Sequence, residues 1–253
     1  MTREFKPDMT VFFPCYNEEE NVERTTMAAV RACERLFDDY EVIIVNDGSK
    51  DRTGEIADRL AATVPNVRAV HNSPNRGYGG ALRRGFSEAR KSYVFYTDGD
   101  GQFDFEEMEM LLPLLRTHDV VSGYRKNRRD PFHRRLNAAC WGKLVDALFG
   151  IGLRDIDCAF KIYPRRLLEK MELCSNGALI DTEMLARSRR LGCSIAQIGV
   201  THYPRTAGEQ TGANLRVVMK AFRELFTLHS QIRATAAKSI PAESHGVAAV
   251  STH

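Results

Sequence analysis

The sequence predicts an α/β fold with a mainly parallel central sheet flanked by helices. Short apolar runs typical of buried strands alternate with amphipathic helical patterns through the first half of the chain. Polar residues follow three of these strands directly. Strands connected through helices form right-handed βαβ crossovers, and the ligands of such sheets bind at the carboxyl ends of the strands. A binding site is therefore expected where these polar residues meet.

The expected elements follow one another in a regular order. The run Val42 to Val45 is apolar without alternation, which indicates a strand buried on both faces. The predicted strands are Thr10 to Phe13, Glu41 to Val45, Val67 to Val70, Tyr93 to Thr97, Val120 to Tyr124 and Ser194 to Val200. Helical periodicity is found from Val22 to Leu36, Ile56 to Val64, Ala81 to Arg90, Trp141 to Phe149, Ile180 to Leu191 and Leu215 to Ile232.

Composition limits the classes of protein. The chain has 253 residues, of which 43% are hydrophobic, so that residues 1–233 suffice for one domain with an ample core. Residues 234–253 offer little to bury and are expected to be a disordered tail. The six cysteines are widely separated, which disfavours a zinc site and indicates reduced thiols in a cytoplasmic protein. The net charge of +3 is too small to indicate nucleic acid.

Two further absences shape the expected location. The polar N-terminus lacks the apolar stretch of a signal peptide. No apolar run approaches the roughly 20 residues of a transmembrane span. We therefore expect a cytoplasmic protein whose membrane contact, if any, is peripheral, on the inner face.

An acidic loop follows the strand that ends at Thr97. Asp98 and Asp100 stand one residue apart, and Gln102 follows them. Carboxylate and amide oxygens are suitable ligands for Mg²⁺ or Mn²⁺, and a partial protein shell leaves positions open for phosphate oxygens. An acidic surface turn would have similar residues. Taken alone the motif would favour such a turn, but the context of the rest of the chain favours a metal-bound phosphate.

Two other strand ends carry polar residues. Pro14 to Glu18 follows the first strand, and Asn46 to Ser49 follows the second. Asn17, Asp47 and Ser49 are also favoured at helix N-caps, and capping is compatible with anion binding by the same loop. Asp47 is placed to accept a hydrogen bond from a ribose hydroxyl or a base. The coincidence of three such strand ends favours a nucleotide site.

A glycine-rich segment, Asn75 to Leu82, precedes a predicted helix. Leu82 occupies the third glycine position of a dinucleotide fingerprint, and the segment follows the third strand instead of the first. No P-loop sequence is present. The segment is interpreted either as a flexible loop that lets Arg76 reach a donor phosphate or as a tight connection without a chemical role.

The three polar motifs together resemble the inverting family 2 glycosyltransferases of GT-A fold, within them the dolichol-phosphate mannose synthase and polyprenyl-phosphate glycosyltransferase branch. The motifs are Pro14 to Glu18, Val45 to Thr53 and Asp98 to Gln102. The resemblance implies a nucleotide-sugar donor, with GDP or UDP, and Mg²⁺ or Mn²⁺ held by Asp98, Asp100 and Gln102. It also implies a donor site formed by Pro14, Tyr16, Glu18, Asp47, Arg76, Asp98 and Arg205.

The chain departs from this family in two places. Asn46 stands where relatives usually carry an aspartate. The segment from His202 to Gly208 is similar to a family segment in which a Ser-Lys pair follows, but here Glu209 to Thr211 follows instead. The match of Arg205 still implies a phosphate contact.

A basic cluster follows the strand that ends at Tyr124, and it consists of Arg125, Lys126, Arg128, Arg129 and Arg134. Arginine suits phosphate geometry, although such a cluster is often only a solvated surface. The resemblance implies an acceptor phosphate site that includes Arg125, Arg134 or Arg135, Asp157 and Lys161. Interleaved aromatic residues and a reader motif are missing from this cluster, so nucleic acid is not expected.

The apolar stripe from Trp141 to Phe149 has two interpretations. Packing of a helix on the sheet is favoured, because such stripes usually serve cores, and contact with a membrane interface is the alternative.

The acceptor decides which mechanism is needed. A lipid monophosphate has a second pKa of about 6 and can attack without a strong base. A hydroxyl acceptor needs a base, for which Asp181 and Glu183 are candidates, although both also suit the first turn of a helix.

The expected function is that of a metal-dependent hexosyltransferase similar to dolichyl-phosphate mannosyltransferases. It moves a sugar to a polyprenyl phosphate, dolichyl or undecaprenyl, at the membrane surface. One alternative has the same donor and a soluble hydroxyl acceptor. A second is a non-catalytic nucleotide-sugar-binding subunit, against which the pair Asp98 and Asp100 argues.

Overall fold

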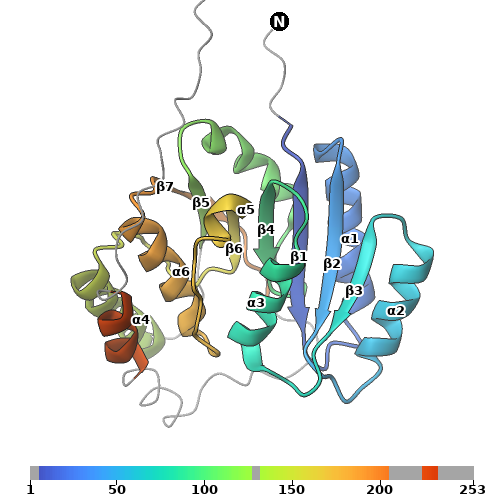
Figure 1. Cartoon of the computed structure of the whole chain (residues 1–253), viewed down its shortest axis with the longest axis horizontal. Helices are drawn as coiled ribbons and strands as arrows, with labels where there is room; N and C mark the ends of the chain where they lie inside the picture. Colours follow the sequence, from blue (N-terminus) through green and yellow to red (C-terminus); the bar gives the residue numbers. More distant parts are fainter. Residues whose placement is uncertain (1–5, 127–131, 205–223, 233–253) are drawn as a thin grey trace, which may run out of the picture.

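The computed structural model describes residues 6–126, 132–204 and 224–232, with side chains from 140 onward in the helix that begins at 132. Among these residues, one seven-stranded sheet has the order β3-β2-β1-β4-β6-β5-β7 (Figure 1). Its strands are β1 (Met9–Cys15), β2 (Tyr40–Asn46), β3 (Val67–His71), β4 (Tyr93–Thr97), β5 (Val120–Arg125), β6 (Phe160–Pro164) and β7 (Ile195–Val200). The predicted fold class is confirmed.

Most strand pairs are parallel, as expected. β1 pairs in parallel with both β2 and β4, β2 pairs in parallel with β3, and β5 pairs in parallel with β7. The antiparallel strand β6 lies between β4 and β5. Sequence reasoning missed β6, because the buried Lys161 interrupts its apolar run.

Helices cover both faces of the sheet. α1 packs on β2 and on α2, and α3 packs on β1 and β2 from the opposite face (Figure 1). The helices are α1 (Val22–Leu36), α2 (Thr53–Thr63), α3 (Gly77–Glu88), α4 (Phe132–Phe149), α5 (Arg165–Leu168) and α6 (Leu179–Arg190), with 3-10 turns η1 (Phe105–Met110) and η2 (Leu112–Arg116). Residues 224–232 are also helical. The remainder of the helix predicted from Leu215, and the tail 234–253, lie outside the described residues.

The core beneath α3 is aromatic and tightly packed. Phe12 meets Phe86 edge-on with ring centroids 4.9 Å apart, and Phe86 meets Tyr96 in the same way at 5.4 Å. Gly85 allows this contact, because a Cβ atom there would lie 2.2 Å from the Phe12 ring. α3 is thereby held close to β1 and β4, whose carboxyl ends carry the polar motifs.

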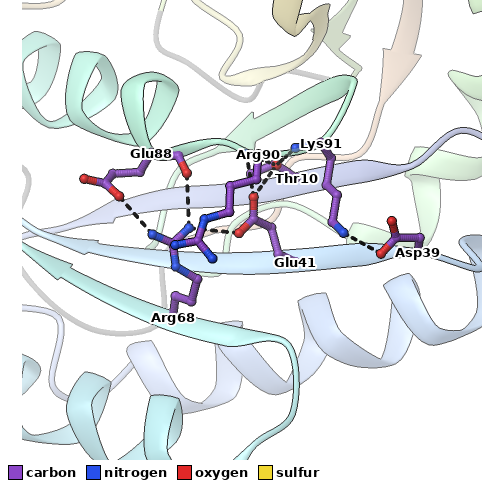
Figure 2. Close-up of polar contacts among 7 residues, drawn as sticks. All are labelled: Thr10, Asp39, Glu41, Arg68, Glu88, Arg90 and Lys91. Carbon is purple, nitrogen blue, oxygen red and sulfur yellow. Dashed lines mark hydrogen bonds and ion pairs between the residues drawn. The ribbon is translucent and has the colours of Figure 1, made fainter.

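The opposite, amino-terminal end of the sheet contains a buried carboxylate. Glu41 is 5% exposed, and it accepts hydrogen bonds from the Thr10 hydroxyl at 2.7 Å and the Arg90 amide at 2.7 Å. Arg68 donates to Glu41 at 2.9 Å and to Glu88 at 2.9 Å. Figure 2 shows these side chains converging from β1, β2, β3 and the end of α3. The network fixes the end of the sheet that is remote from the polar loops.

The apolar stripe of α4 packs on the core. Val145 is fully buried, and Trp141, Leu144, Leu148 and Phe149 are partly buried against the core cluster. The favoured packing interpretation is therefore confirmed. Among the described residues, no helix combines the length and the apolar character needed to cross a membrane.

Candidate active site

The polar loops after β1, β2 and β4 meet because these strands are neighbours in the sheet. The amide of Asp47 donates to the carbonyl of Cys15 at 2.9 Å, which joins the ends of β2 and β1. The Thr25 hydroxyl of α1 donates to the carbonyl of Gly99 at 3.3 Å. A Cβ atom at Gly99 would lie 2.5 Å from the carbonyl oxygen of Pro14. The expected convergence of three strand ends is thus observed.

Asp98, at the end of β4, is partly buried and receives a hydrogen bond from α3. The Tyr78 hydroxyl donates to Asp98 Oδ1 at 3.0 Å. Burial, and then the charges of Asp100 and Asp181, raise the pKa of Asp98 from 3.8 to about 7. The nearby Lys161 only partly offsets this effect. The environment of Asp98 therefore disfavours its negative charge.

Asp100 and Gln102 lie in the turn that follows. The Gln102 amide donates to Asp100 Oδ1 at 3.1 Å, and Gly101 supplies the positive φ of 73° that the turn requires. The Gln102 side chain donates through Nε2 to the carbonyl of Tyr203 at 2.7 Å. This side chain joins the acidic loop to the segment after β7. Its predicted role as a metal ligand stays a prediction.

The two carboxylates of this loop, Asp98 and Asp100, are suitable ligands for a divalent cation. Among the described residues, no cluster of three or more His, Cys, Asp or Glu side chains is arranged to hold a metal. The raised pKa of Asp98, caused by burial and by the adjacent Asp100, indicates a site where a cation would relieve repulsion. Oxygen ligands of this kind suit Mg²⁺ or Mn²⁺ with further ligands from a bound diphosphate.

Asp47 is held by the segment that precedes α3. It is 3% exposed, and its Oδ1 accepts hydrogen bonds from Asn72 Nδ2 at 2.8 Å and from the Arg76 amide at 2.9 Å. Asn75 donates to the Asp47 carbonyl at 2.7 Å. The predicted nucleoside contact of Asp47 would use its other oxygen. The Arg76 side chain is exposed.

The first motif is fixed by its contacts with the second. Asn17 has a φ of 55°, its amide donates to the Ser49 hydroxyl at 3.0 Å, and its side chain accepts from the Lys50 amide at 2.8 Å. Glu18 accepts from Asn21 Nδ2 at 2.7 Å. Tyr16 is 43% exposed and is available to a ligand.

Asp181, one of the two predicted bases, forms a buried ion pair with Lys161. Lys161 is fully buried, and its ammonium donates to Asp181 Oδ1 at 2.5 Å and to the Cys158 carbonyl at 2.7 Å. The Tyr96 hydroxyl donates to the same Asp181 oxygen at 2.5 Å. Lys161, predicted to bind the acceptor phosphate, is thus engaged inside the protein.

Glu183, the other predicted base, holds a loop. It is fully buried, and it accepts hydrogen bonds from the amides of Cys174 at 3.1 Å and Ser175 at 2.8 Å and from Arg187 Nε at 2.9 Å. Burial would raise the pKa of Glu183, but the hydrogen bonds from Ser175 and Cys174 outweigh it, so that the pKa is lowered. These contacts are those of a structural carboxylate.

The acceptor-side residues are also paired. Arg125 forms a two-pronged ion pair with Asp155, with Nε to Oδ2 at 2.8 Å and Nη2 to Oδ1 at 2.9 Å. Asp157 is exposed to solvent, yet desolvation by surrounding protein and the charges of Asp181 and Asp155 raise its pKa to about 6. Arg205 and the side chains of Arg134 and Arg135 lie outside the described residues.

Sequence reasoning missed three residues of this region. Tyr78 and Tyr96 were considered only as parts of a glycine-rich segment and a strand, and Asp155, two residues before the predicted Asp157, was given no role. Each contacts a predicted site residue: Tyr78 contacts Asp98, Tyr96 contacts Asp181, and Asp155 contacts Arg125. The sequence does show that the Tyr78 hydroxyl stands between two glycines and that the Tyr96 hydroxyl stands inside an apolar run.

Solved structures show the same fold. Mannosyl-3-phosphoglycerate synthase from Rubrobacter xylanophilus matches with a TM-score of 0.70 at 16% identity, over 93% of this chain and 78% of that chain. Glucosyl-3-phosphoglycerate synthase from Mycobacterium tuberculosis, in complex with Mn²⁺, UDP-glucose and phosphoglyceric acid, matches with a TM-score of 0.68 at 20% identity, over 89% of this chain and 79% of that chain. The predicted GT-A fold is confirmed.

Curated relatives are more similar in sequence. Glycosyltransferase AglD of Haloferax volcanii is 34% identical over 78% of this chain and 33% of its own length. Undecaprenyl-phosphate 4-deoxy-4-formamido-L-arabinose transferase of Aeromonas hydrophila is 31% identical over 79% of this chain and 61% of its own length. The chain thus spans about one third of the first relative and about three fifths of the second.

A sequence profile supplies the family. The profile of glycosyl transferase family 2 matches residues 10–172, a segment that begins in β1 and includes the three polar motifs, β6 and α5. This match covers more than half of the chain and agrees with both curated relatives. The predicted resemblance is confirmed, and the chain belongs to glycosyl transferase family 2.

Proposed function

We propose that this chain transfers a sugar from a nucleotide-sugar donor to a polyprenyl phosphate, with a divalent metal ion at Asp98 and Asp100. The observation that carries the proposal is the position of these two carboxylates at the carboxyl end of β4, at the same edge of the sheet as Asp47 at the end of β2, with β1 between the two strands. The family and the name of the undecaprenyl-phosphate transferase relative support it.

The donor side uses the groups that surround this sheet edge. Asp98 and Asp100 would hold the metal ion, and Asp47 would accept a hydrogen bond from the nucleoside. The metal, when bound, offsets negative charge on the departing nucleoside diphosphate. Without a cation, the negative charges of Asp98 and Asp100 repel one another, and a bound metal ion with its nucleotide sugar would reduce this repulsion.

The acceptor side favours a group that is already nucleophilic. A phosphate monoester with a second pKa of about 6 carries the charge needed for attack at neutral pH. Asp181 and Glu183 are both buried and engaged by internal donors, which makes them poor bases for a hydroxyl group. A lipid phosphate removes the need for either. Transfer would take place at a membrane surface, where such an acceptor resides.

The two described cations of the predicted acceptor site act indirectly in this proposal. Arg125 holds Asp155, and Lys161 holds Asp181. If Arg125 bound the acceptor phosphate directly, the phosphate would replace the Asp155 carboxylate as its partner. Since phosphate and carboxylate both fit the guanidinium fork, such an exchange is chemically reasonable for Arg125 and much less so for the fully buried Lys161.

The proposal is tested by incubating the protein with radiolabelled UDP-, GDP- and dTDP-sugars and undecaprenyl or dolichyl phosphate. Label should enter the butanol-extractable lipid with one donor. EDTA and the Asp100→Asn substitution should each abolish this transfer. Donor hydrolysis without labelled lipid would reject the lipid acceptor while leaving the donor class intact.

A soluble hydroxyl acceptor is the second candidate, and Asp157 favours it. Desolvation by surrounding protein and the charges of Asp181 and Asp155 raise the pKa of Asp157 to about 6, which suits this carboxylate to take a proton from a hydroxyl group near neutral pH. In that case Asp157→Asn should abolish transfer to the soluble acceptor. If lipid phosphate is the acceptor, the same substitution should leave transfer measurable, because no base is required.

A further inference from the structure

The start of α3 makes a contact with the acidic loop that the family motifs do not include. Tyr78 is the second residue of α3, and its hydroxyl donates to Asp98 Oδ1 at 3.0 Å. A phenol hydroxyl carries its proton at neutral pH, so the Tyr78 hydroxyl is the donor in this contact. One oxygen of Asp98 is therefore fixed, and the other is left for a ligand.

The loop before α6 in turn holds the start of α3. The amide of Gly79 donates to the carbonyl of Asn176 at 2.9 Å. A Cβ atom at Gly79 would lie 2.4 Å from the Ser175 carbonyl oxygen, and one at Gly77 would lie 3.0 Å from the Asn176 carbonyl oxygen. Arg83, one turn further along α3, donates to the Leu173 carbonyl at 3.2 Å. Glycine is thus required here for close packing.

This packing changes the interpretation of the glycine-rich segment. Gly77, Gly79 and Gly80 belong to α3 itself, so that, of the two interpretations of this segment, the flexible loop is wrong at these positions. Gly77 and Gly79 lie against the loop from Leu173 to Asn176, and Gly80 lies against the Arg76 side chain. Glu183 anchors that loop through the amides of Cys174 and Ser175. A continuous set of contacts leads from α6 to Asp98.

We propose that Tyr78 is a positioning residue that orients the Asp98 carboxylate for metal binding, and that the loop from Leu173 to Asn176 holds Tyr78 in place. The inference rests on the proposed metal site. The glycines allow the loop to approach α3, the loop sets the position of the helix start, and the helix start places the hydroxyl. Without the hydroxyl, the Asp98 side chain can rotate away from the geometry that a cation requires.

The first test is Mn²⁺ binding, measured by electron paramagnetic resonance with and without UDP or GDP. Tyr78→Phe should weaken Mn²⁺ binding about tenfold, the effect of losing one hydrogen bond to a charged group. Tyr163→Phe is the matched control, because the buried Tyr163 hydroxyl has no hydrogen-bond partner among the described residues. The control should bind Mn²⁺ like the parent, and both variants should keep the parent melting temperature within a few degrees.

The second test displaces the helix start without touching Tyr78. Gly79→Ala places a methyl group against the Ser175 carbonyl and should weaken Mn²⁺ binding in the same direction. In a helix, alanine is more favourable than glycine by about 1 kcal/mol, so the effect of the substitution on the helix alone would be stabilising and would not weaken Mn²⁺ binding. Gly177→Ala is the control, since a Cβ atom at Gly177 would meet nothing within 4 Å among the described residues.

The outcomes separate this inference from the proposed function. Parent-like Mn²⁺ binding by Tyr78→Phe, together with loss of binding in Asp100→Asn, would overturn the positioning role and leave the metal site intact. Mn²⁺ binding that is equal in the parent and in Asp100→Asn would instead reject the metal site itself. Weakened binding in Tyr78→Phe and Gly79→Ala, with both controls unchanged, is the expected result.

Discussion

The buried ion pair between Lys161 and Asp181 gives the sharpest test of how this site is built. Both side chains are almost fully inaccessible, with exposures of 0% and 4%. The Lys161 ammonium donates to Asp181, the Cys158 carbonyl and the Tyr96 hydroxyl at 2.5, 2.7 and 3.1 Å. Lys161→Met keeps most of the side-chain volume and removes the charge. The carboxylate of Asp181 then stays buried with only the Tyr96 hydroxyl as a described donor.

The expected loss follows from this geometry. Removing one partner of a buried ion pair costs about 3–5 kcal/mol, because the remaining charge is left uncompensated. For a chain of this length, such a loss lowers the melting temperature by about 6–20 °C. Urea unfolding followed by circular dichroism measures the free energy of unfolding directly. A loss below about 1 kcal/mol would refute the assignment of a buried, charged pair.

A double substitution separates structure from chemistry. Lys161→Met with Asp181→Asn removes both charges and should regain most of the lost stability, since a buried pair is often replaceable by neutral groups. If Asp181 is not a base, the double variant should retain substantial transfer activity. If Asp181 is the base, activity should disappear in the double variant even though stability returns.

Three further predictions concern the fold and the acidic loop. Glu41→Gln should lower the free energy of unfolding, measured in urea, by about 1–3 kcal/mol, because the buried oxygens of Glu41 accept several hydrogen bonds. Asp39→Asn, in the exposed ion pair between Asp39 and Lys91, should cost less than about 1 kcal/mol. Equal losses in the two variants would contradict the network in Figure 2. Gly85→Ala should cost about 1–3 kcal/mol through overlap with the Phe12 ring, as thermal unfolding would show, and a parent-like melting temperature would contradict this packing. Burial and neighbouring carboxylates raise the pKa of Asp98 from 3.8 to about 7, so that this group binds more protons in the folded chain than in the unfolded chain in this window. The contribution of Asp98 to the stability of the metal-free protein should therefore fall as the pH rises from about 4 to 7. Asp98→Asn should make that fall shallower, and identical melting curves against pH for parent and variant would refute the raised pKa.

The sequence predicted those parts of the fold in which local pattern and tertiary environment agree. The run Val42 to Val45 of β2 is apolar without alternation because helices cover both faces of this strand. The three strand ends could be predicted to converge, because neighbouring parallel strands end at one edge of a sheet. β6 escaped prediction because its second residue, Lys161, is charged. Only a partner distant in sequence, Asp181, makes that charge acceptable in the core.

The roles of the glycines and of the acidic residues in α6 could not be predicted for a related reason. Gly79 was interpreted from the conformational freedom of glycine. In the structure, its lack of a side chain allows the backbone at Ser175, about a hundred residues further along the chain, to approach α3. Glu183 has a side chain that could serve as a base, but its contacts with the amides of Cys174 and Ser175 show that it anchors a loop. In both cases the deciding partner is remote in sequence, and no local pattern identifies it.

The electrostatics of the site connect its stability with its proposed function. After burial, the largest effects on the pKa of Asp98 come from the charges of Asp100 and Asp181, and the ammonium of Lys161 offsets them only in part. The folded chain therefore maintains, at neutral pH, a carboxylate whose charge is unfavourable. Such a site binds a cation more strongly than a neutralised one would, because binding relieves a repulsion that folding has already imposed. A metal ion and the diphosphate it carries should accordingly stabilise the chain most above pH 7, where Asp98 is ionised. Below pH 6 a proton on Asp98 competes with the metal, and the stabilisation by Mn²⁺ should decline.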